Sequence, residues 1–176
     1  KNKVKTFLEI LQLKMNLILG VGFLSQYILR CAPRIAKNWG VNRSGEDNAL
    51  EANGEIFQAD VLVERSLEGL SSRISDFDGY VFYLIPPSSF GDRPIDESLS
   101  PLFKILKKGF IRGVAVISST GVFSEFDGAV VNHSTAVIGT SSRVQRLLEI
   151  ENAWLASPFQ VAIVRLAGLY GNSRII

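Results

Sequence analysis

The chain has 176 residues, of which 47% are hydrophobic and 20% charged, a composition typical of one globular domain with a sizeable core. Its formal net charge of +2, without an arginine-rich or aromatic-interleaved patch, argues against a nucleic-acid partner. One cysteine, Cys31, excludes an internal disulfide framework and a multi-cysteine metal site, and its helical spacing from Phe23 and Tyr27 predicts a buried side chain. One histidine, His133, cannot build a His-rich metal centre, so we predict no metal.

Residues 1–14 form a basic, amphipathic segment ahead of Met15, the only methionine. We treat them as an N-terminal extension whose origin is open, and we predict one domain over 15–176. The apolar run that follows is too short to span a membrane, and no small-residue cleavage site accompanies it. We therefore expect a cytoplasmic protein without a membrane partner.

The apolar run from Met15 breaks at two closely spaced glycines and continues into a helical pattern over 23–31. A nucleotide-binding βαβ unit begins in this way. The first glycine allows the tight turn, the second lets backbone approach a pyrophosphate, and the helix N-terminus faces the phosphates. The third position of the fingerprint usually holds Gly or Ala, and here it holds Ser25. The predicted cofactor contacts at this turn are Gly20, Gly22, Phe23 and Leu24.

Strand and helix patterns alternate along the remaining chain. We predict strands at 37–42, 55–59, 80–85, 113–118 and 161–166, and helices at 67–74, 99–110 and 142–156. In the last helix Ser142 is the expected N-cap, with Gln145 at capping-box spacing, and Val144, Leu147, Leu148 and Leu155 are expected to face inward. The alternation predicts an α/β fold: a doubly wound parallel sheet with helices on both faces.

Ligands of such sheets bind beyond the carboxyl ends of the strands. The second strand ends in Asn42, Arg43 and Ser44, not in the acidic residue that accepts a free ribose 2′-hydroxyl. Arg43 can pair with a 2′-phosphate, which favours NADP over NAD, unless it is a surface arginine in a turn. Asp60 can accept from an adenine amino group or cap a helix. Pro86 follows the strand predicted at 80–85, and Ser118 ends the strand predicted at 113–118. These two residues are the remaining predicted cofactor contacts.

Together these motifs resemble the extended and atypical short-chain dehydrogenase/reductases, especially the nucleoside-diphosphate-sugar epimerase-like branch. The resemblance runs from Met15 to Arg174 and implies an NAD(P)-binding Rossmann-like fold. It rests on the glycine turn at 19–26, the strand end at 82–87, the Ser-Ser stretch at 117–123 and the Arg-x-x-x-x-Tyr-Gly signature at 165–171.

The resemblance implies that Ser119 hydrogen-bonds a reacting carbonyl or hydroxyl group. It also implies a Tyr/Lys acid–base pair at the start of the helix after the long loop. The chain has no tyrosine between Ser124 and Leu169 and no lysine after Lys108, so this pair is missing. Arg143 or Arg146 can bind a phosphate or ribose, but arginine is a poor proton donor. His133 is the alternative acid/base, weighed against an exposed loop histidine.

Two functions stay open from the sequence. The first is an NADP-dependent epimerase, dehydratase or reductase that acts on a sugar nucleotide or a related hydroxyl/carbonyl substrate, with Ser119 as the polarising residue. The second is a catalytically idle dinucleotide-binding module, a redox sensor or partner-binding subunit. The family's C-terminal substrate lobe is not expected within this chain. By analogy, helices 99–110 and 142–156 form a possible homodimer contact.

Overall fold

The computed structural model describes residues 15–31, 36–45, 54–123, 128, 130–137 and 141–169, with backbone only for Arg30 and Cys31. The proposed extension at 1–14 and the predicted burial of the Cys31 side chain therefore lie outside the described part of the chain.

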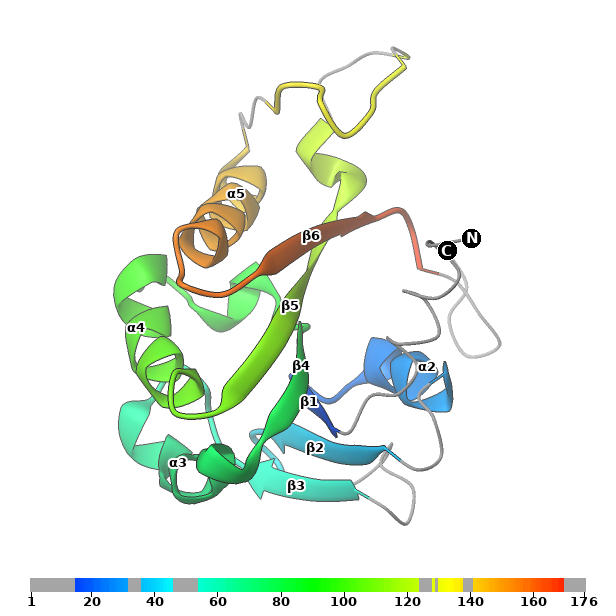
Figure 1. Cartoon of the computed structure of the whole chain (residues 1–176). Helices are drawn as coiled ribbons and strands as arrows, with labels where there is room; N and C mark the ends of the chain where they lie inside the picture. Colours follow the sequence, from blue (N-terminus) through cyan, green and yellow to red (C-terminus); the bar gives the residue numbers. More distant parts are fainter. Residues whose placement is uncertain are drawn as a thin grey trace.

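Six parallel strands form one sheet in the order β3-β2-β1-β4-β5-β6. Their bounds are β1 Met15–Leu19, β2 Lys37–Asn42, β3 Gly54–Gln58, β4 Asp78–Tyr83, β5 Phe110–Ser119 and β6 Val161–Leu166. The strand order reverses between β1 and β4, which is the topological switch point where doubly wound folds bind ligands (Figure 1). The predicted α/β class and parallel sheet are confirmed.

Helices lie on both faces of the sheet (Figure 1). Helix α2 (Phe23–Cys31) lies on one face, and α3 (Glu68–Arg73), α4 (Ile95–Leu106) and α5 (Ser142–Leu155) lie on the other. Short 3-10 turns η1 (Glu64–Leu67), η2 (Ile74–Asp76), η3 (Pro87–Ser89) and η4 (Thr120–Phe123) complete the connections.

The main core lies between the strands and the α3–α5 layer. Alternate strand residues such as Leu17, Val81 and Val114 point toward this layer and are buried. Trp154 of α5 is fully buried beneath them, with its ring 5.1 Å from that of Tyr83. This packing fixes α5, and with it the residues at its N-terminus, against the ends of β4 and β5.

Three local expectations were wrong. The helix expected at 99–110 begins earlier, at Ile95, directly after Pro94, whose ψ of 133° is not helical, and Asp96 lies in its first turn, where an acidic residue is favourable. It ends at Leu106, since Phe110 already joins β5. The cap of α5 is Ser141, whose Oγ accepts from the Val144 N–H at 3.3 Å. Leu155 is 57% exposed, because the inward face of α5 passes instead through Ile150, Glu151 and Trp154.

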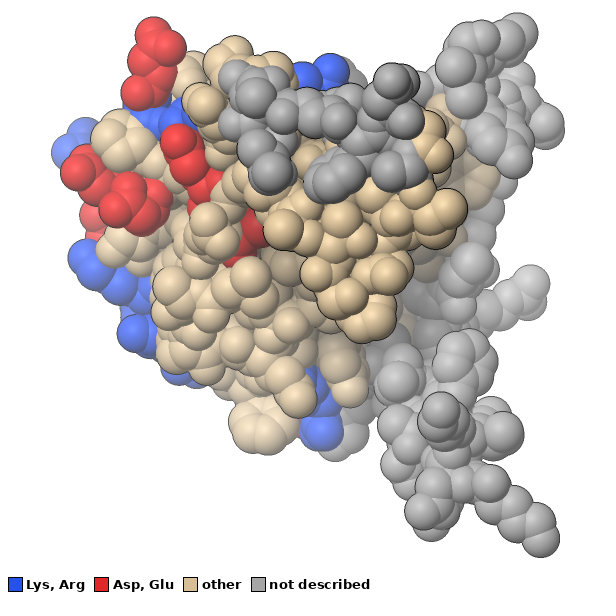
Figure 2. Space-filling view, turned by 90° about the horizontal axis from the view of Figure 1, so that it is seen from above, with Lys and Arg blue, Asp and Glu red and all other residues tan. Residues whose placement is uncertain are grey.

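Charged side chains of both signs gather toward the side of α4 and α5, and the neighbouring face is largely uncharged (Figure 2). Among the residues that the structure describes, no helix is long and apolar enough to cross a membrane. In the same part of the chain, no group of three or more His, Cys, Asp or Glu side chains could hold a metal ion.

Candidate functional site

A hollow of about 420 Å³ lies at the carboxyl edge of the sheet, around the switch point. We call it the first hollow. Its walls come from four segments that are far apart in sequence: Gly20–Gly22, Val41–Ser44, Ala59–Val61 and Leu84–Pro86, with Ser89. Most of the polar residues predicted from the ends of β1 to β4 therefore meet in one place.

The glycine turn forms one wall of this hollow. Gly20 has a φ of 96°, a left-handed conformation that favours glycine, and its N–H donates to the Val41 carbonyl at 2.9 Å. A Cβ at Gly20 would lie 3.1 Å from Cγ1 of Ile85, so the turn also needs its small size. A Cβ at Gly22 would meet nothing within 4 Å. The fold therefore explains glycine at position 20, and the space beside Gly22 is open for a ligand.

Phe23 and Leu24 begin α2 directly after this turn. Their backbone N–H groups belong to the first helical turn, which has no acceptors inside the helix and carries the positive end of the helix dipole. Ser25, at the third position of the fingerprint, is fully buried. Its hydroxyl hydrogen-bonds Gly22, so the serine is accommodated within the turn without displacing it.

The turn after β2 presents Arg43 and Ser44 at the opposite wall. Asn42 holds this turn, because its Oδ1 accepts from the Gly45 N–H at 2.7 Å. Gln58 of β3 donates from Nε2 to the Arg43 carbonyl at 3.2 Å. The side chains of Arg43 and Ser44 are exposed and line the first hollow. The Arg43 guanidinium and the Ser44 hydroxyl thus lie at the position where dinucleotide-binding folds contact the 2′ position of the ribose.

Asp60 follows β3 and also lines the first hollow. Its Oδ1 accepts from the Leu62 N–H at 3.0 Å, and its own N–H donates to Ser66 Oγ at 3.1 Å. Asp60 therefore holds the turn after β3. It does not cap a helix, because the cap position of η1 is Val63, which makes no side-chain cap bond. Asp60 is the one acidic residue among the described residues that line the first hollow.

Pro86 lines the first hollow and also a second one of about 710 Å³. The second hollow lies between the segment after β4 and the N-terminus of α5, and is lined by Pro86–Ser88, Gly91, Asp92, Ser142, Arg143 and Arg146. The segment at 86–92 is thus a wall that the two hollows share.

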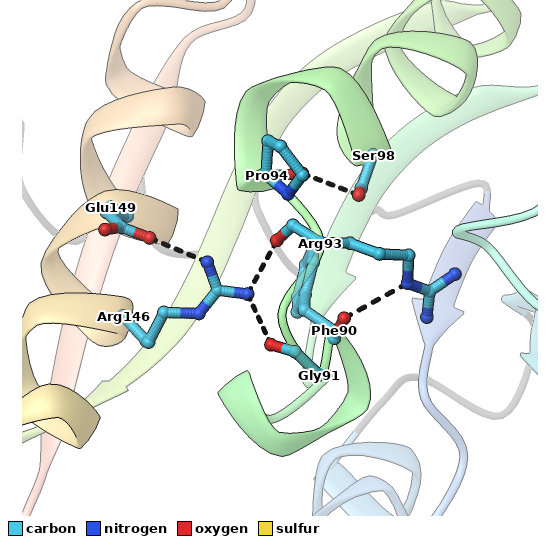
Figure 3. Close-up of polar contacts among 7 residues, drawn as sticks. All are labelled: Phe90, Gly91, Arg93, Pro94, Ser98, Arg146 and Glu149. Atoms are coloured by element: carbon cyan, nitrogen blue, oxygen red, sulfur yellow. Dashed lines mark hydrogen bonds and ion pairs between the residues drawn. The ribbon is translucent and has the colours of Figure 1, made fainter.

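Arg146 ties this wall to α5 (Figure 3). One guanidinium nitrogen donates to the carbonyls of Gly91 at 2.9 Å and Arg93 at 2.7 Å, and the other pairs with Glu149 at 3.0 Å. The Arg93 side chain in turn donates to the Phe90 carbonyl. Arg146, considered in the sequence as a phosphate or ribose ligand, is engaged by the protein itself. Arg143 lines the second hollow without a partner among the described residues.

Ser118 and Ser119, at the end of β5, do not line either of these two hollows. Ser118 is 8% exposed and donates from Oγ to Glu151 Oε1 at 2.6 Å. The Ser119 hydroxyl oxygen accepts from the Gly121 N–H at 3.1 Å. Successive strand residues point to opposite faces, which separates the two hydroxyls. Ser118 is therefore directed toward α5.

Glu151 is a residue that the sequence did not single out. It is 2% exposed, and Arg165 of β6 binds both its oxygens at 3.1 and 2.7 Å. The hydrogen bond to Glu151 raises the pKa of Arg165 above its ordinary value. The sequence does hold one signal for it, because Glu151 is an acidic residue on the apolar face of the helix predicted at 142–156. This buried network joins β5, α5 and β6 next to Ser119.

No described tyrosine or lysine stands at the start of α5. Tyr83, at the end of β4, is fully buried, and burial raises the pKa of its hydroxyl above the ordinary range. His133 is exposed in the turn at 132–135. The described residues therefore hold backbone and cationic groups suited to phosphates, and lack the usual proton donor of the resembled family.

No protein-family model and no curated protein matches the sequence of this chain. Solved structures match its fold. A protein from Methylobacillus flagellatus, provisionally assigned as an NAD-dependent epimerase/dehydratase, is 24% identical, with a TM-score of 0.73 over 93% of this chain and 57% of that one. UDP-glucuronic acid 4-epimerase from Bacillus cereus, in complex with NAD, is 17% identical, with a TM-score of 0.69 over 89% and 58%. The enzyme WbmG from Bordetella bronchiseptica, in complex with NAD, is 13% identical, with a TM-score of 0.66 over 86% and 52%.

These likenesses, with the strand order and the switch-point hollow, define the class: the chain has the Rossmann fold found in NAD-binding epimerases. It spans a little more than half the length of each of these structures. The fold expected from the sequence motifs is therefore confirmed.

Proposed function

We propose that this chain binds NADP(H) in the first hollow and forms the dinucleotide-binding part of an epimerase- or reductase-like protein of the short-chain dehydrogenase/reductase family. The observation that carries the proposal is the pairing of two features across one hollow. Gly22 leaves open space beside the helix N-terminus, and Arg43 with Ser44 faces it from the end of β2. The first suits a pyrophosphate and the second suits a 2′-phosphate.

The preference for NADP over NAD rests on charge. An NAD site places Asp or Glu at the end of the second strand to accept from the ribose 2′-hydroxyl, and this strand ends at Asn42. The Asn42 side chain already holds the turn that presents Arg43. Arg43 can donate charge-assisted hydrogen bonds to a phosphate, interactions stronger than those between neutral groups.

The test compares NADPH and NADH by calorimetry on the full chain. Removing Arg43 (Arg43→Ala) is expected to lower NADPH affinity about 10- to 100-fold, corresponding to about 1.5–3 kcal/mol for a hydrogen bond to a charged group. NADH affinity should change less than about threefold, because NADH lacks the 2′-phosphate. Arg65→Ala is the matched control, since Arg65 is exposed and lines neither the first nor the second hollow. No binding of either nucleotide by the folded wild-type protein would refute the proposal.

The substrate of an active form would be a sugar nucleotide or a related hydroxyl/carbonyl compound. The support is the likeness to epimerases, together with the second hollow, which adjoins the first at Pro86. The polarising role that the resemblance implies for Ser119 has no support from these two hollows, because Ser119 lines neither of them. NADPH oxidation in the presence of a panel of such substrates tests this proposal.

A second candidate function is a dinucleotide-binding module without turnover. Its support is the start of α5, where Arg146 is engaged by backbone carbonyls and neither tyrosine nor lysine is present among the described residues. Tight NADPH binding without hydride transfer to any member of the panel would favour this module over the enzyme.

A further inference from the structure

Ser25 makes two hydrogen bonds to a single residue of the glycine turn. The Gly22 N–H donates to Ser25 Oγ at 2.9 Å, and the same hydroxyl donates to the Gly22 carbonyl at 2.5 Å. Ser25 is fully buried, behind the turn and away from solvent. One side chain therefore satisfies both polar groups of Gly22.

Gly22 depends on such a contact for its orientation. It precedes α2 and has no side chain with which to cap the helix, and a glycine backbone rotates more freely than any other. Ser25, three residues later, accepts from its N–H in the way that the third helical residue does in a capping box. The hydroxyl thus fixes the peptide planes on both sides of Gly22.

The side of Gly22 that faces away from Ser25 is open to the first hollow. Gly22 is exposed and lines the first hollow, and a Cβ there would meet no protein atom within 4 Å. Because its N–H is directed at Ser25, that N–H does not serve as a phosphate donor. The first-turn N–H groups that follow it are the donors that remain, and their direction is set by the Gly22 backbone.

We infer that Ser25 is a positioning residue for the pyrophosphate of the bound dinucleotide: its hydroxyl locks Gly22 so that the start of α2 is aimed into the first hollow. This inference rests on the proposed function, and it deepens it by assigning a role to the residue that replaces the usual third glycine. Ser25 does not line the first hollow, so its effect is exerted through Gly22.

The alternative is that Ser25 only packs α2 against the sheet. A packing role would affect every ligand of the first hollow to the same extent. A positioning role affects the pyrophosphate and spares a probe that lacks one. Adenosine 2′-monophosphate is such a probe, because it carries the phosphate expected at Arg43 without a pyrophosphate. ADP-ribose carries the pyrophosphate without the 2′-phosphate.

The experiment measures the affinities of NADPH, ADP-ribose and adenosine 2′-monophosphate for the full chain and for Ser25→Ala and Ser25→Gly. The second variant restores the small residue usual at this position, so that loss of the hydroxyl is tested with and without a Cβ. Ser98→Ala is the matched control, since Ser98 Oγ makes a comparable bond to the Pro94 carbonyl at 2.6 Å in the first turn of α4.

We expect both Ser25 variants to bind NADPH and ADP-ribose about tenfold more weakly, about 1.4 kcal/mol, and adenosine 2′-monophosphate within about twofold of wild type. Ser98→Ala should leave all three affinities unchanged. An equal loss for the three probes, unchanged binding, or tighter binding of the pyrophosphate probes would each overturn the inference. Failure of the wild-type chain to bind any probe would instead refute the proposed function.

Discussion

The two ends of the carboxyl edge of the sheet use their polar groups in opposite ways. At the glycine-turn end, Arg43 and Ser44 line the first hollow, and the space beside Gly22 is open. At the α5 end, polar side chains bind one another: Glu151 holds Ser118 and Arg165. One end leaves polar groups at the wall of a hollow, and the other uses them to join structural elements. The first end is therefore the one where substitutions should change ligand affinity under the proposed function, and the second is the one where they should change stability.

The largest expected effect is a loss of NADPH affinity at the glycine-turn end. Replacing Gly22 with aspartate (Gly22→Asp) places a carboxylate in the open space where a pyrophosphate would approach. Repulsion between unit charges about 4 Å apart amounts to about 4 kcal/mol in a partly screened site, or about 1000-fold in affinity. Calorimetry should find no NADPH binding, with the thermal midpoint of unfolding nearly unchanged because no protein atom is displaced. Retained NADPH affinity would show that the ligand does not pass beside Gly22.

The next effect concerns stability at the α5 end. Glu151→Ala leaves the Arg165 guanidinium and the Ser118 hydroxyl without their partner, in a region where the carboxylate side chain is 3% exposed. Breaking a buried pair costs about 3–5 kcal/mol, and we expect the lower value because Arg165 is partly exposed. The thermal midpoint should fall by about 6–12 °C.

The control for that variant is Arg112→Ala, which removes an equally close but solvent-exposed pair with Asp78. Exposed pairs contribute little to stability. If Glu151→Ala and Arg112→Ala lowered the midpoint equally, the α5 end would not be held by its buried network.

A smaller effect is expected where α5 contacts the wall between the hollows. Arg146→Ala removes the donors to the Gly91 and Arg93 carbonyls, at a cost of about 1–2 kcal/mol. Arg146→Lys should recover only part of this loss, because an ammonium lacks the planar fork of a guanidinium. Arg143→Ala, on the same helix and without a partner among the described residues, should leave the unfolding midpoint in place. An equal shift for both alanine variants would contradict the assigned contact.

The smallest effect is a null result at His133. Its side chain is exposed in a turn that is held by Asn132, whose Oδ1 accepts from the Ser134 N–H at 2.9 Å. We expect His133→Ala to retain wild-type NADPH affinity and any measured turnover at neutral pH. A loss of turnover with unchanged NADPH affinity would contradict this expectation and support His133 as the catalytic acid or base.

The sequence predicted the fold well because the buried strands are continuous apolar runs and the helices are periodic. The glycine turn was equally readable, since Gly20 and Gly22 act through backbone conformation and the absence of a side chain. Side-chain pairing was not readable in this way. Glu151 finds its partners on two strands distant in sequence, and periodicity records burial but not contacts. The one-residue error at the α5 cap has the same origin, because Ser141 and Ser142 have equal intrinsic capacity to cap.

The shared wall at 86–92 has a mechanical consequence. Pro86 contributes to both hollows, and Arg146 fastens the same segment to a helix whose Trp154 is fully buried. The segment therefore lines two hollows while Arg146 binds it to one helix. Any displacement of the segment would change a wall of both hollows at once, and would have to break the two hydrogen bonds from Arg146.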